Sequence, residues 1–129
     1  MILSVRTDKP EAEVGVYDGA NELSYIKWQA HRELELTLLM KIEESLKQAG
    51  ITKAELSGVI VYEGPGSFTG LRIGFAVVNT LASELDIPNA VGAGDNWQSQ
   101  AIESLSDKSE PQILIPNYGG DANITLPKK

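Results

Sequence analysis

The sequence of 129 residues contains no cysteine and only one histidine, His31. Without cysteine the chain can form no disulfide bond, offers no thiolate nucleophile and has no cysteine-based metal site. A single histidine also excludes a metal site built from several histidines of one chain. His31 itself is interpreted as a cap or surface residue, because the sequence shows no nucleophile or substrate group for a base to serve. These absences remove much of the common catalytic chemistry.

Basic residues and long apolar runs are also scarce. The chain has 11 Lys and Arg against 18 Asp and Glu, a net charge of −7 and a pI near 4.6. That charge disfavours direct binding to the phosphate backbone of nucleic acids. The longest nearly apolar stretch, 71–82, is interrupted by polar residues and is too short to cross a bilayer, and the N-terminus has no signal-peptide pattern. We therefore expect one cytoplasmic domain without membrane contact.

The hydrophobic pattern predicts strands first and helices later. Short β-rich runs separated by polar turns predict an antiparallel three-strand meander at 2–5, 14–17 and 23–28. From 33 to 49, apolar residues recur at three- and four-residue steps up to Gly50, which predicts a helix with a glycine C-cap. The elements expected after it are a short turn capped by Thr52, a buried strand at 58–62, a helix at 71–85, a strand at 89–91, a helix at 96–105 capped by Asp95 and a short strand at 112–115.

This order of elements indicates an α/β fold with one mixed five-stranded sheet. The antiparallel meander comes first, and helices then alternate with strands. We assign residues 1–105 to one domain. Residues 106–129 are polar and rich in turn-forming residues, so we interpret them as a short tail or loosely attached edge.

A glycine-rich segment joins the predicted strand at 58–62 to the helix that follows. Glycines at such a junction, with the free amides of a helix start, can hold a phosphate, and the candidate residues are Gly64, Gly66, Ser67, Thr69, Gly70 and Arg72. The segment lacks the Gly-Lys-Ser/Thr ending of a Walker loop and does not match G-x-G-x-x-G. Pro65 also removes one amide donor. The favoured interpretation is a tight turn in which Ser67 or Thr69 caps the helix.

The helix at 71–85 is apolar around most of its circumference, so it must be buried on most sides. One side can lie on the sheet. The other needs either the first helix or a partner protein, and both interpretations stay open.

The segment 64–74, GPGSFTGLRIG, resembles the signature of the TsaB (YeaZ) family, the non-catalytic partners in bacterial tRNA threonylcarbamoyladenosine synthesis. Further matches are the strand before it, the segment 85–88 after it, the turn at 17–19, and His31 with the leucine-rich helix behind it. The resemblance covers about residues 1 to 95. It implies a ribonuclease H-like domain of the actin-like ATPase superfamily that supports a paralogous catalytic subunit, TsaD.

The resemblance also implies partners and a surface for them. In this family the TsaB-type chain and TsaD pair through the helices of their N-terminal domains, and a small ATPase, TsaE, is the usual third component. A second copy of this chain, in a dimer through the same helices, is the other candidate for contact. The residues carried over as interface candidates are Leu34, Leu38, Leu39, Ile42, Leu71, Phe75, Val78, Asn79 and Ala82. No catalytic residue, metal or cofactor is expected in this chain, although ATP or ADP at a partner interface stays open.

The chain departs from the family pattern in three places. Arg6-Thr7-Asp8 stands where the first strand of the family usually ends in an Asp-Thr-Ser-like phosphate motif, which makes independent ATP hydrolysis less expected. Only some 35 residues follow the matched region, so 106–129 would be a tail or remnant of a second subdomain. The two-histidine metal motif of the catalytic paralogue cannot exist here. The functional expectation is a scaffold that activates a TsaD-like enzyme; the alternative is a nucleotide-binding or hydrolysing domain that uses the loop at 64–70.

Overall fold

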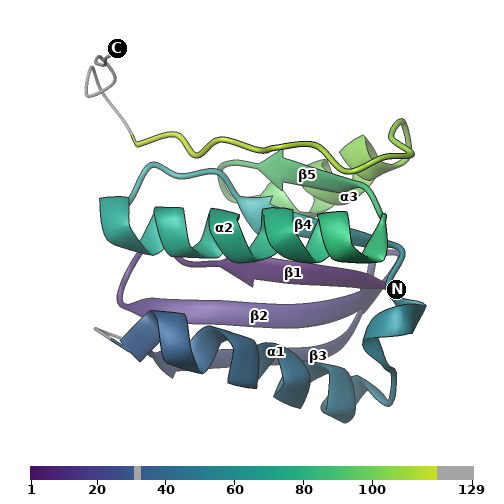
Figure 1. Ribbon diagram of the computed structural model, residues 1–129, viewed down its shortest axis with the longest axis horizontal. Coiled ribbons are helices and arrows are strands. Elements are labelled where there is room, and N and C mark those ends of the chain that lie inside the picture. Colours follow the sequence, from purple (N-terminus) through teal and green to yellow (C-terminus); the bar gives the residue numbers. More distant parts are fainter. Residues whose placement is uncertain (31–32, 119–129) are drawn as a thin grey trace.

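One mixed sheet organises the computed structural model of the chain, which describes residues 1–30 and 33–118. Its strands are β1 (Ile2–Arg6), β2 (Glu11–Asp18), β3 (Asn21–Gln29), β4 (Gly58–Tyr62) and β5 (Asn89–Gly92). They lie in the order β3-β2-β1-β4-β5 (Figure 1). β1 pairs antiparallel with β2, and β2 with β3, whereas β1 pairs parallel with β4, and β4 with β5. The predicted mixed five-stranded sheet is confirmed.

Helices cover both faces of the sheet. The helical elements are α1 (Leu34–Ala49), the 3-10 turn η2 (Lys53–Glu55), α2 (Phe68–Leu85) and α3 (Trp97–Leu105). α1 and α2 lie side by side on one face, and α3 lies on the other, over β4 and β5 (Figure 1). β4 is buried on both faces, with Val59 and Val61 in the main core and Ile60 in a smaller core under α3. This two-sided burial explains why β4 is a continuous apolar run.

The helix ends follow local capping chemistry. Gly50 adopts a left-handed conformation at the end of α1, as predicted. α2 begins at Phe68 rather than at residue 71, because the Ser67 side chain accepts a hydrogen bond from the amide of Gly70 at 3.2 Å. The prediction for α3 is wrong in one respect. Its N-cap is Asn96, which makes no side-chain capping bond, and not Asp95.

The predicted strand at 112–115 is not formed. Residues 111–118, which we call the C-terminal strap, form an extended segment that runs beside α2 (Figure 1). The strap contacts the domain, since Leu114 and Tyr118 pack against the main core. Residues 119–129 and His31 lie outside the described residues. Within residues 1–30 and 33–118, none of the helices combines the length and the apolar composition that spanning a bilayer requires.

Candidate functional site

The glycine loop at 64–70 packs against the turn that follows β1. The backbone amide of Ser67 donates to the carbonyl of Asp8 at 2.8 Å, and the buried Thr7 hydroxyl donates to the carbonyl of Gly70 at 2.8 Å. A Cβ atom at Gly66 would stand 2.5 Å from the Cβ of Asp8. Glycine is therefore required in this loop by the close approach of the turn, whether or not a ligand binds.

Charges around the loop do not favour a phosphate. The carboxylate of Asp8 accepts two bonds from the Arg6 guanidinium, at 2.8 and 3.3 Å, and Arg6 also lies 3.9 Å from the ring centroid of Tyr62. Two amides at the helix start, those of Ser67 and Gly70, already have partners within the loop region. These contacts support the interpretation as a tight, capped turn over that of a phosphate loop.

Two further candidates of the glycine segment, Thr69 and Arg72, have other surroundings. Arg72 places its guanidinium 5.3 Å from the ring centroid of Phe68. Thr69 lines a cavity of about 280 Å³ together with Lys9 and Pro10 of the turn after β1. Thr69 and Lys9 therefore line one cavity, whereas Arg72 is engaged with an aromatic ring.

Most of the residues predicted at the partner interface lie in the core of this chain. The buried ones are Leu34, Leu38, Ile42, Leu71, Phe75, Val78 and Ala82. They contribute to packing inside this chain, and of them only Ile42 also lines the groove described below. Of the other two, Leu39 is 57% exposed, whereas the half-buried Asn79 binds the strap. The predicted set therefore falls mainly on the inner faces of α1 and α2.

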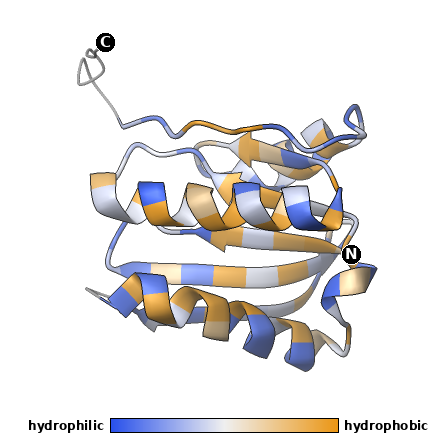
Figure 2. Ribbon diagram, in the orientation of Figure 1, coloured by the Kyte–Doolittle hydropathy of each residue, from blue (hydrophilic) through white to orange (hydrophobic). Residues whose placement is uncertain are grey.

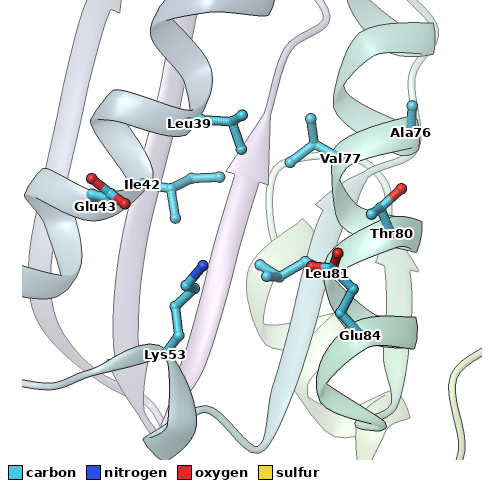
Figure 3. Close-up of a pocket in the computed structure, with 9 residues that line it drawn as sticks. All are labelled: Leu39, Ile42, Glu43, Lys53, Ala76, Val77, Thr80, Leu81 and Glu84. Atoms are coloured by element: carbon cyan, nitrogen blue, oxygen red, sulfur yellow. The ribbon is translucent and has the colours of Figure 1, made fainter.

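An apolar groove of about 430 Å³ separates the outer parts of α1 and α2. Leu39 and Ile42 point from α1 towards Val77 and Leu81 of α2 (Figure 3). Lys53 of η2 stands at one end. The remaining lining residues are Glu43, Ala76, Thr80 and Glu84. The groove therefore combines an apolar floor with charged rims.

Two further apolar side chains of α1 are exposed. Leu36 is 67% exposed and Met40 is 62% exposed. Sequence reasoning missed both, although a signal was present: apolar residues occupy 34, 36, 38, 39, 40 and 42, more positions than one buried stripe needs. Exposed apolar surface of this kind is typical of an interaction site.

A polar cluster on the opposite face of the sheet links α3 to the β2–β3 hairpin. Gln98 donates to the hydroxyls of Tyr17 and Tyr25, each at 3.1 Å, and the Tyr25 hydroxyl donates to the carboxylate of Glu13. Burial, followed by the neighbouring Glu22, raises the pKa of Tyr17 to about 12. Burial and the Glu13 carboxylate raise the pKa of Tyr25 as well. Both phenols are thus held in their neutral form, which suits a structural link.

The known proteins most informative about this chain belong to one pathway. A family model described as TsaD, tRNA N6-adenosine threonylcarbamoyltransferase, matches residues 28–92, half of the chain. The tRNA threonylcarbamoyladenosine biosynthesis protein TsaB of Bacillus subtilis is 33% identical over 69 residues, which are 54% of this chain and 28% of that protein. The solved structure of YeaZ from Pseudomonas aeruginosa superposes with a TM-score of 0.66 at 26% identity, covering 71% of this chain and 43% of that one. The chain belongs to this family, among its TsaB (YeaZ) members.

A relative named as the transferase matches more of the chain. The tRNA N6-adenosine threonylcarbamoyltransferase of Phocaeicola vulgatus is 36% identical over 107 residues, 77% of this chain and 31% of that protein. The chain therefore spans less than half the length of the relatives that it matches. The structural match confirms the predicted ribonuclease H-like, actin-like fold for the described domain.

Proposed function

We propose that the chain is a non-catalytic subunit in formation of the threonylcarbamoyl modification of the adenosine next to the tRNA anticodon. Its role is to bind a TsaD-like enzyme and stabilise the active conformation of that enzyme. Membership of the TsaB (YeaZ) family supports the process. The net charge of −7 supports a division of labour in which the partner contacts most of the tRNA.

The observation that carries the partner role is the apolar groove between α1 and α2. Its floor comes from Leu39, Ile42, Val77 and Leu81, and α1 also exposes Leu36 and Met40. A helix with an apolar ridge fits such a groove, because two existing helices and one inserted helix can pack side chains between one another. We place the partner helix in this groove, which includes Leu39 and Ile42 but none of the other residues first expected at the interface.

The same surface is open to competing occupants in this proposal. A second copy of the chain would bury the same apolar side chains in a homodimer, and the enzyme would then displace that copy. A TsaE-like ATPase, with ATP or ADP at an interface, would join the complex without help from the glycine loop. The amides of Ser67 and Gly70 in that loop, and the neighbouring Asp8 carboxylate, are engaged within the chain.

The test is a pair of charge substitutions in the groove. The purified chain is mixed with the TsaD of the same organism, and complex formation is followed by light scattering while threonylcarbamoyl transfer to tRNA is assayed. Leu39→Asp combined with Val77→Asp should weaken the complex at least about tenfold, since a buried unpaired charge at an interface centre is costly. The stimulation of transfer should fall with it.

Ile113→Asp is the matched control, because Ile113 is 86% exposed on the strap and does not line the groove. This variant should bind and stimulate like the parent chain. Absence of any complex with the parent chain would reject the partner role. An unchanged complex with the doubly substituted chain would reject the groove as its site.

A further inference from the structure

Two asparagine side chains hold the C-terminal strap by its backbone. The Asn79 side chain on α2 accepts from the amide of Leu114 and donates to its carbonyl, both at 3.0 Å. The Asn89 side chain on β5 makes the same pair of bonds with Gln112, both at 2.9 Å. Each side-chain amide thus satisfies both polar backbone groups of one residue, as a neighbouring strand would. Residues two apart on an extended chain face the same side, so two asparagines on one side of the strap can bind alternate residues.

The two asparagines also support one another. The Nδ2 atom of Asn89 donates to Oδ1 of Asn79 at 3.2 Å, and Asn89 is fully buried. Asparagine is a poor residue for the middle of a helix and for a strand. Both positions therefore depart from local propensity, which is expected where a side chain serves recognition.

Side-chain contacts fix which residues of the strap lie opposite the two asparagines. Leu114 packs against the main core, and the Tyr118 ring lies 4.6 Å from that of Phe68. Ile113 and Ile115 point away, with 86% and 75% of their surface exposed. Figure 2 colours the middle of the strap as hydrophobic, but of Ile113, Leu114 and Ile115 only Leu114 packs against the domain. Near its far end the amide of Asn117 donates to the carbonyl of Glu63 at 2.9 Å.

We propose that Asn79, Asn89 and the flank of α2 form a binding site for an extended peptide, and that the strap is its detachable occupant in cis. The ligand is an extended peptide that offers free backbone N–H groups at positions equivalent to 112 and 114. It carries an apolar side chain at the position of Leu114 and an aromatic side chain at the position of Tyr118. The strap can leave because side-chain amides, and not strand pairing, hold residues 112 and 114. This inference does not depend on the partner role proposed above.

The test supplies the strap as a separate peptide to the full chain. Gln112→Pro with Leu114→Pro removes the two amides that the asparagines bind, and so empties the site in cis. A fluorescent peptide of residues 109–118 should then bind saturably. Adding Asn79→Ala to the same chain should weaken that binding at least about tenfold, the effect of about one lost bidentate contact.

Ile113→Pro is the matched control, because its proline lies between the two recognised residues and leaves their amides intact. The site of this variant stays filled in cis, so the peptide should bind at least about tenfold more weakly than to the doubly substituted chain. Equal peptide binding with and without Asn79→Ala overturns the proposal. Absence of binding to the folded, doubly substituted chain does so too.

Hydrogen exchange of the unmodified chain gives an independent measurement. The amides of Gln112 and Leu114 should exchange at least about tenfold faster than those of β4, through opening of the strap alone. If they exchange only together with β4, or if the doubly substituted chain does not fold, the strap is an integral part of the core and the proposal is wrong.

Discussion

Thr7 shows how a single residue fixes the arrangement of the glycine segment. It is 1% exposed, and its hydroxyl donates to the carbonyl of Gly70 at 2.8 Å. A Cβ atom at Gly74 would stand 2.1 Å from that hydroxyl oxygen. Gly74 therefore lets the first turns of α2 lie directly on the end of β1, which brings the glycine loop against Asp8.

Gly74→Ala should lower the free energy of unfolding by about 1–3 kcal/mol, because the added methyl group overpacks a rigid contact. Alanine gains up to about 1 kcal/mol of helix propensity over glycine, so a neutral or stabilising result would show that Thr7 moves aside easily. Chemical denaturation measures the difference. Ser83→Ala, at an exposed position of the same helix, should stay within about 0.5 kcal/mol of the parent chain.

Helix α1 carries apolar residues on two faces. The sequence therefore predicts the helix itself but not which of its faces is buried. Its existence and its glycine C-cap followed from periodicity and from Gly50. The choice between core and surface did not, because Leu38 and Leu39 are identical in type and adjacent in sequence. Only the position of the sheet makes Leu38 fully buried and leaves Leu39 57% exposed.

Paired alanine substitutions test this assignment. Leu38→Ala should lower the free energy of unfolding by about 2–5 kcal/mol, because it leaves a cavity in the core. Leu39→Ala should change it by less than about 0.5 kcal/mol, because its side chain is exposed in the isolated chain. Thermal and chemical denaturation of the two variants give the comparison. Similar losses in both would mean that the groove is closed in solution.

At the scale of the whole molecule, the sheet was predictable and the strap was not. The meander, the buried run of β4 and the strand–loop–helix unit each have a local signal of period or turn chemistry. The strap depends on Asn79 and Asn89, which bind Leu114 and Gln112 across 35 and 23 residues of sequence. No local period reveals a bond between a side-chain amide and a distant backbone.

The polar cluster under α3 makes the stability of the whole molecule depend on pH. Unfolding returns Tyr17 from a pKa of about 12 to its ordinary value near 10, and it lowers the raised pKa of Tyr25 in the same direction. Stability from these groups is therefore complete below pH 10 and is lost as the pH rises towards 12. Denaturation at pH 8, 10 and 11 should show this decline, and Tyr17→Phe should reduce its slope. A parent chain equally stable at pH 8 and pH 11 would contradict the assignment.

The central place of β1 has a consequence for the order of folding. Its antiparallel neighbour β2 follows it directly, whereas its parallel neighbour β4 places Gly58 opposite Ile2. Bringing β1 and β4 together closes a longer loop than pairing β1 with β2, so it costs more chain entropy before the β1–β4 contacts form. We expect the meander with α1 to form the nucleus and the half built from β4, α2 and β5 to dock afterwards. Substitutions in β2 would then slow refolding, while those in β5 would mainly accelerate unfolding.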